Sequence, residues 1–175
     1  MTDNATAMVR RTIYQSTEQK LTDGIREFLE RQPFAVLATY NPDGSIHVVP
    51  LSYMFEDGRF FLATSSSSRK ARNLAARPEA TVTVDDRITL EWVSATGTAE
   101  LIRGERSREI NARLYRRSWT DAGLEMVGPL LEQNEDVTIA ITPRRWSAWD
   151  IQSTFFAALQ DAGIPLDGAE NWFQT

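Results

Sequence analysis

Residues 60–85, FFLATSSSSRKARNLAARPEATVTVD, constrain the fold of this chain more than any other segment. Two runs within it, 60–65 and 80–85, place side chains alternately on two sides at the period of a β-strand. Four consecutive serines at 65–68 then lead into a short basic stretch that predicts a helix, with Ser67 or Ser68 as its N-cap. The segment therefore predicts a strand, a tight turn, a short helix and a second strand.

The start of this predicted helix has the composition of an anion site. The first N–H groups of a helix have no partner inside the helix and attract negative charge. Arg69 and Lys70 add two cations at this point, where basic residues alone would oppose the helix dipole. The sequence thus predicts a phosphate cradle at 64–70. Taken alone, the pattern fits a serine-rich turn before a solvated basic helix equally well.

The rest of the chain predicts one β-rich domain with helical additions. Thr22 or Asp23 is expected to cap a helix that runs to Arg31, and Asp57-Gly58 is a two-residue hairpin signal. Further strands are expected at 34–40, 46–53, 88–102 and 137–142, and further helices at 105–117, 122–131 and 154–160. Six or so strands with short hairpins favour an antiparallel barrel. We expect a flexible arm at 1–17, the barrel at 18–150, and a helical extension packed on it at 151–175.

Pro50 lies inside the strand-like run HVVPLSY. Proline has no N–H to give to a strand ladder, so this strand is expected at an edge or where pairing lapses. Free backbone groups beside it are then available to a ligand. The competing interpretation, which the residues alone favour, is an edge strand protected by its proline against aggregation.

Several of these segments together resemble the pyridoxamine 5'-phosphate oxidase family. Thr64, then Ser68-Arg69-Lys70-Ala71, then Pro78 and a strand, is similar to that family's flavin-binding segment. FAVLATY, its turn at 41–44 and the following strand are similar to the family's opening hairpin, and the strand containing Gly97 also has a counterpart. The resemblance covers about 25–150, in the family's order.

The resemblance implies a mainly β fold, a split antiparallel β-barrel of the Greek-key, FMN-binding type. It also implies a homodimer whose two cofactor sites lie between the subunits. The ring of the cofactor would dock on the segment around Pro50, and the chain near Trp149 would reach the site from the second subunit. The cofactor-binding residues expected in this way are His47, Val48, Val49, Pro50, Leu51, Ser52, Ala63, Thr64, Ser65, Ser68, Arg69, Lys70, Trp92 and Trp149.

The chain also departs from the family. Trp92 falls near a position where true oxidases carry a glutamine, and the C-terminal DGAENWFQT replaces a basic tail that helps to hold the substrate phosphate. We therefore expect an oxidoreductase that acts on another small organic molecule, with FMN or the deazaflavin coenzyme F-420 as cofactor. No catalytic base is assigned. A non-catalytic protein that stores or senses flavin or haem is the alternative.

The sequence lacks the residues that several other kinds of catalytic or metal site require. The 175 residues include no cysteine and one histidine, which excludes structural zinc and thiol nucleophiles. There is no G-x-S-x-G, P-loop or G-x-G-x-x-G motif. A carboxylate pair from Asp85, Asp86 and Glu91 is more typical of a solvated turn. A net charge of −5, with no long apolar stretch, predicts a cytoplasmic protein that binds neither nucleic acid nor membrane.

Arginine and tryptophan gather toward the C-terminal half. Six arginines between 103 and 117 could contact RNA, but interleaved Glu105 and Glu109 favour a solvated or subunit-facing helix. Tryptophans usually fill cores or interfaces. We expect Trp92, Trp119, Trp146 and Trp149 to contribute apolar surface to a dimer.

Overall fold

The computed structural model describes residues 18–133 and 135–169, so the arm expected at 1–17 lies outside the described residues. In this part of the chain eight strands run at Glu18–Gln19 (β1), Phe34–Tyr40 (β2), Ile46–Ser52 (β3), Met54–Glu56 (β4), Arg59–Ser65 (β5), Glu79–Asp86 (β6), Glu91–Ile102 (β7) and Asp136–Asp150 (β8). Helices occupy Asp23–Arg31 (α2), Arg69–Ala76 (α3), Gly104–Ser118 (α4), Asp121–Gln133 (α5) and Ala157–Asp161 (α6), the last preceded by a π-helical turn at Ile151–Phe156 (η1).

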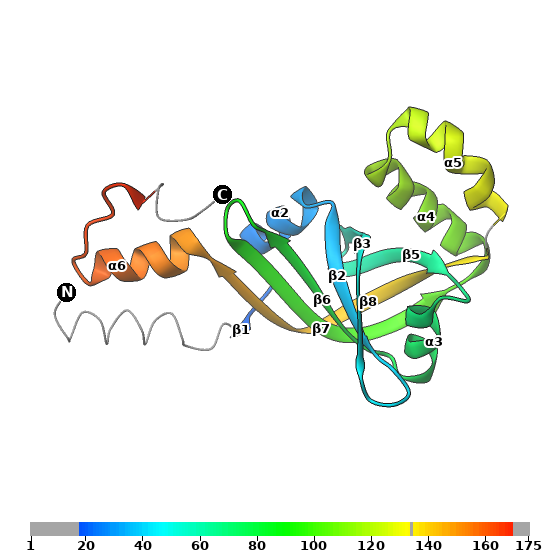
Figure 1. Cartoon of the computed structure of the whole chain (residues 1–175), viewed down its shortest axis with the longest axis horizontal. Helices are drawn as coiled ribbons and strands as arrows, with labels where there is room; N and C mark the ends of the chain where they lie inside the picture. The colour runs from blue at the N-terminus through cyan, green and yellow to red at the C-terminus, as the bar shows by residue number, and fades with distance from the viewer. Residues whose placement is uncertain (1–17, 134, 170–175) are drawn as a thin grey trace.

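The strands form one antiparallel sheet in the order β3-β2-β6-β7-β8-β5-β4, with β1 beside β8. Its two outermost strands, β3 and β4, are separated by Tyr53 alone, so the sheet curls until its edges meet at that corner without a continuous ladder (Figure 1). This is the expected split antiparallel barrel. β3 is an edge strand, as Pro50 predicts.

Two helices close the ends of the barrel. Phe28 and Leu29 of α2 enter the core at one end, and the hydroxyl of the buried Tyr53 donates to the carbonyl of Leu29 over 2.6 Å. Leu74 of α3 enters the same core at the other end. Between them the inward residues of the strands fill the barrel, among them Leu37, Leu62, Val82, Ala95, Ile139 and Ile141.

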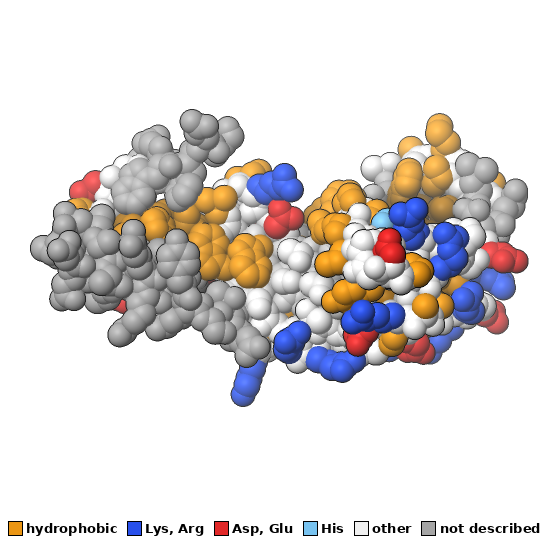
Figure 2. Space-filling model, turned by 60° about the horizontal axis from the view of Figure 1, so that its bottom comes forward, with side chains coloured by type: hydrophobic (Ala, Val, Ile, Leu, Met, Phe, Trp, Pro, Cys, Tyr) orange, Lys and Arg blue, Asp and Glu red, His pale blue; other side chains and the backbone are white. Residues whose placement is uncertain are grey.

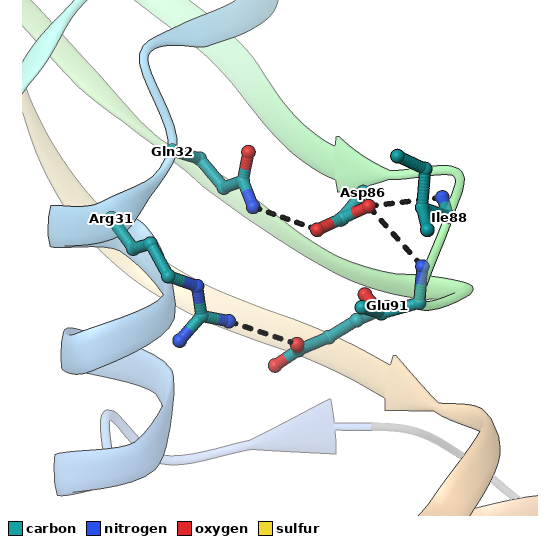
Figure 3. Close-up of polar contacts among 6 residues, drawn as sticks. Arg31, Gln32, Asp86, Ile88 and Glu91 are labelled. Carbon is teal, nitrogen blue, oxygen red and sulfur yellow. Dashed lines mark hydrogen bonds and ion pairs between the residues drawn. The ribbon is translucent and has the colours of Figure 1, made fainter.

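The α2 end is also tied by polar contacts to the turn between β6 and β7 (Figure 3). Gln32 donates to Asp86 over 3.0 Å, and Arg31 forms an ion pair with Glu91 over 3.4 Å. The second carboxylate oxygen of Asp86 accepts from the backbone N–H groups of Ile88 and Thr89. The turn and the helix are therefore held as one unit.

β7 and β8 approach closely at Gly97. A Cβ built at this position would stand 2.1 Å from the carbonyl oxygen of Thr142, and the register of the two strands shifts between Thr96 and Gly97. Only glycine fits such a bulge without moving a backbone.

The structure changes two of the sequence-based expectations and adds to a third. β8 is one strand of 15 residues, longer than the run expected at 137–142. The last helical segment begins at Ile151, in a π-helical turn, before the expected start at 154. Trp146 is half-buried and packs on Phe55 and Phe60, so part of its surface contributes to the core.

Helices cover only part of the outer surface of the sheet. Ile110 of α4 packs with Phe61, Ile102 and Ala140, which covers the region of β5, β8 and the end of β7. Figure 1 shows α4 and α5 together at this side, and α6 at the opposite end of the molecule. None of the described helices is long and apolar enough to cross a bilayer.

Candidate functional site

The serine turn between β5 and α3 is held by its own hydroxyl groups. Thr64 is buried, and its hydroxyl donates to that of Ser68 over 3.0 Å. Ser68 is the N-cap: its hydroxyl accepts from the N–H of Ala71 over 3.2 Å. The backbone N–H of Ser68 in turn donates to the carbonyl of Ser65 over 3.0 Å. Thr64 and Ser68 therefore build the turn, and their hydroxyls already have partners.

The remaining serines of the turn differ from these. Ser65 and Ser67 are exposed and their hydroxyl oxygens lie 2.9 Å apart. Arg72 donates to the carbonyl of Ser67 over 2.5 Å, and the N–H of Ser66 donates to the carbonyl of Glu135 over 3.0 Å. The turn is thus fixed from two sides while two hydroxyls face solvent.

Arg69 and Lys70 stand at the first turn of α3. Within the described ranges, neither forms an ion pair. Arg69 is exposed, while Lys70 is half-buried and its burial lowers the pKa of its ammonium group. A half-buried cation that has no carboxylate beside it, next to exposed hydroxyls and a helix N-terminus, fits a phosphate.

Asn73 fixes α3 on the barrel. This buried side chain donates to the hydroxyl of Thr39 over 3.1 Å and to the side-chain oxygen Oδ1 of Asn41 over 3.0 Å. Ala71 and Leu74 are buried on the same side of the helix. The helix is therefore tied to β2 and to the turn that follows it.

The antiparallel registers bring the first residues of β3 to the cradle end of the barrel. Tyr40 pairs with Ile46, and Ser65 pairs with Asp136 at the start of β8. Along β3, Val49 and Leu51 pack against the core, while Val48 and Pro50 are exposed. His47 is half-buried. The expected residues Ala63–Lys70 and the start of β3 thus share one end of the barrel, whereas Ser52 lies at the other.

Trp92 and Trp149 lie toward that other end. They face each other across β7 and β8, and Trp92 also pairs with Asp85. Thr98, which pairs with Glu79 at the cradle end, lies six positions along β7 from Trp92. At about 3.3 Å per residue this is a distance of about 20 Å. One chain alone does not bring these tryptophans to the cradle.

The uncovered part of the sheet, which we call the open face, consists of outward residues from β3, β2, β6 and β7. Hydroxyl pairs cross it, with Thr81 and Thr96 3.0 Å apart and Thr83 and Ser94 3.1 Å apart. Figure 2 shows hydrophobic side chains in two groups, one of which lies among Lys and Arg side chains. The middle of the open face carries no charged side chain, while Glu79 and Asp85, in the same alternation at the two ends of β6, are charged and exposed. The members in the middle are Phe34, Val36, Ala38, Tyr40, Ile46, Val48, Pro50, Thr81, Thr83, Ser94 and Thr96.

This architecture agrees with the comparison of the sequence with known families. The model of a family described as pyridoxamine 5'-phosphate oxidase matches residues 21–150, which include every strand from β2 to β8. The chain belongs to this family. No curated protein matches it in sequence.

Solved structures of the family type share the fold. A conserved hypothetical protein, Rv2991 from Mycobacterium tuberculosis, is 28% identical with a TM-score of 0.64, over 78% of this chain and 88% of that one. A protein described as an F420 reductase is 21% identical with a TM-score of 0.61, over 73% and 98%. HutZ, described as a haem storage protein from Vibrio cholerae, is 18% identical with a TM-score of 0.58, over 75% and 95%.

Sequence reasoning missed Asn73 and Thr39. Asparagine is a poor helix former, so its place in the middle of α3 was a signal of a specific polar contact. Its partner could not be found in the sequence, because 34 residues separate the two.

Proposed function

We propose that this protein is an oxidoreductase of the pyridoxamine 5'-phosphate oxidase family that uses FMN or deazaflavin coenzyme F-420 on a small organic substrate. The observation that carries the proposal is the pair Arg69 and Lys70, which have no ion-pair partner in the described part of the chain, at a helix start beside exposed serines. Arg69 and Lys70 neutralise the cofactor phosphate. Ser65, Ser67 and the N–H groups of the first turn of α3 donate hydrogen bonds to it.

The bound cofactor supplies the hydride chemistry, and the chain supplies position and electrostatics. β3 is an edge strand in which Pro50 gives no N–H to a ladder, so the backbone groups of His47–Ser52 that point away from β2 are available to the polar edge of the ring. Burial lowers the pKa of Lys70, and a phosphate beside it would act in the opposite direction, because an anion favours the charged ammonium.

The site is completed by a second copy of the chain. The middle of the open face is apolar or hydroxyl-bearing, with Glu79 and Asp85 at the two ends of β6. Phe34, Ile46 and Val48 on this face are 61%, 60% and 57% exposed. Such a face is typical of subunit contacts. In a dimer with these faces packed together, a two-fold axis lies in the plane between them, perpendicular to the strands. This axis sets the Trp92 and Trp149 end of the partner against the cradle end of this chain. The two groups of expected site residues, about 20 Å apart in one chain, then meet in one site.

A second candidate is a protein that holds haem or flavin without turnover. It is favoured by His47, the single histidine of the chain, which is half-buried at the start of β3 and offers an imidazole to an iron. The similarity to HutZ extends to the fold alone.

The visible absorbance spectrum of the purified protein, with the mass of the extracted ligand, tests the proposal. FMN, a deazaflavin and haem have different spectra and masses. We expect the extracted ligand to be a flavin or a deazaflavin. An added electron acceptor should then reoxidise the reduced cofactor over many cycles. Haem, or a tightly held cofactor that is never turned over, would support the second candidate instead.

A further inference from the structure

A cavity lies behind the serine turn. It has a volume of about 790 Å³ and opens between α4, the end of α5 and the first residues of β8. Asn111 and Val137 on its lining are buried, and Ala112 and Leu131 are half-buried. This volume is within the range of pockets that bind small molecules. Ser66 also lines the cavity, so the cavity adjoins the cradle, but Arg69 and Lys70 are not part of its lining.

α4 turns one face toward this cavity. Gly104, Arg108, Asn111 and Tyr115 follow one another at helical spacing and all line it. Ser107, Ile110 and Leu114 pack on the barrel in an adjoining buried stripe. Asn111 belongs to both, because it lines the cavity and accepts from the hydroxyl of Thr138 over 2.7 Å. At about 100° per residue, Arg106 lies on the side of α4 opposite to the cavity-lining face. α4 thus packs on the core with one stripe of residues and lines the cavity with the adjoining stripe.

The charged side chains around the cavity differ in whether they already have a partner. The hydroxyl of Tyr115 donates to the carboxylate of Asp136 over 2.7 Å. Burial, and then this hydrogen bond, raise the pKa of Tyr115, so its hydroxyl remains a donor. Arg103 and Arg108 are exposed at the rim and form no ion pair within residues 18–133 and 135–169. Of the carboxylates in the lining, Asp136 is therefore already engaged and only Glu135 is exposed.

We propose that this cavity binds a small organic acid, with its apolar body between Ala112, Leu131 and Val137 and its carboxylate at Arg103 and Arg108. Two guanidinium groups at the mouth of a pocket bind a carboxylate through charge-assisted hydrogen bonds. The side chains inside offer apolar contact to the body of the ligand. This site is separate from the cradle, and the proposal does not depend on the proposed function.

A pair of matched probes tests the acid site: naphthalene-2-carboxylate and the neutral naphthalene-2-carboxamide, titrated into the full chain by ligand-observed NMR. We expect the acid to bind at least about tenfold more tightly than the amide, as a charge-assisted bond predicts. Changing Arg103→Ala and Arg108→Ala together should abolish this preference, and Arg106→Ala should keep it. Ala112→Phe, which fills the cavity, should weaken both probes.

Equal affinity for acid and amide, no binding of either, or the same preference after the double change would overturn the proposal. A similar loss with Arg106→Ala would also overturn it, because a general attraction to the basic helix would then explain the binding. Circular dichroism of each variant shows that the fold is kept. Cofactor absorbance should be unchanged by the Arg103 and Arg108 variants, so failure of the acid site is distinguished from failure of the cofactor site.

Discussion

The buried carboxamide of Asn73 donates to the buried hydroxyl of Thr39 over 3.1 Å, and this contact joins the helix of the cradle to the barrel. Asn73→Ala leaves Thr39 and the side-chain oxygen of Asn41 without this donor. We expect the free energy of unfolding to fall by about 1 to 3 kcal/mol in urea. Cofactor affinity should fall as well, since Arg69 and Lys70 belong to the same helix.

A double-mutant cycle separates this contact from a general effect of the smaller side chain. Thr39→Val and Asn73→Ala should each destabilise the protein, and the two together should cost at least about 0.5 kcal/mol less than their sum. Strict additivity would show that the two side chains do not act as a pair.

Gly97 tests the bulge between β7 and β8. Gly97→Ala places a methyl group against the carbonyl of Thr142, so a backbone must move. We expect a loss of about 1 to 3 kcal/mol in the free energy of unfolding, as overpacking usually costs. Gly24→Ala is the matched control, because a Cβ there meets nothing within 4 Å. A tolerated alanine at position 97 would contradict the register described here.

Glu91 predicts a pH dependence of stability. Burial raises the pKa of its carboxyl, and the charges of Asp150 and Asp86 raise it further. The ion pair with Arg31 lowers this pKa, but by less than burial raises it. A raised pKa means that the folded state binds this proton more tightly than the unfolded state. Stability from this group is therefore lost as the pH rises from the ordinary glutamate range through the raised pKa.

Glu91→Gln removes that dependence. Thermal unfolding is followed between about pH 4 and 7. Over this range the stability of the native chain should fall with rising pH in part because of Glu91, and the variant should not show that part of the fall. Glu100→Gln, on the same strand and in a surface ion pair with Arg59, is the control and should follow the native profile. Identical profiles for Glu91→Gln and the native chain would rule out this role.

The open face predicts a dimer whose interface exceeds about 2,000 Å² in total, as obligate homodimers usually have. Val48→Asp puts a charge in the middle of this face. It should dissociate the dimer in sedimentation and release the cofactor, whose absorbance is followed in the same run. Met126→Asp, on an apolar residue of α5 that is even more exposed, should change neither. A native monomer that keeps its cofactor would refute the shared site.

Local patterns in the sequence predicted much of the fold. Asp57 and Gly58 both have positive φ, at 51° and 75°, as the hairpin signal requires, and Thr22 and Ser68 are N-caps. Contacts between distant segments could not be read in the same way. The packing of Trp146 on the core, the anchor from Asn73 to Thr39 and the cavity behind the serine turn all depend on how strands far apart in sequence curl together.

The central claim is the phosphate cradle, and calorimetry tests it most directly. The native chain and an Arg69→Ala, Lys70→Ala variant are titrated with the cofactor found in the protein and with its phosphate-free form, for example FMN and riboflavin. Arg106→Ala with Arg116→Ala is the charge-matched control. The variant should lose at least about 2 kcal/mol of binding free energy for the phosphorylated ligand and little for the other. Equal losses for the two ligands would contradict the cradle.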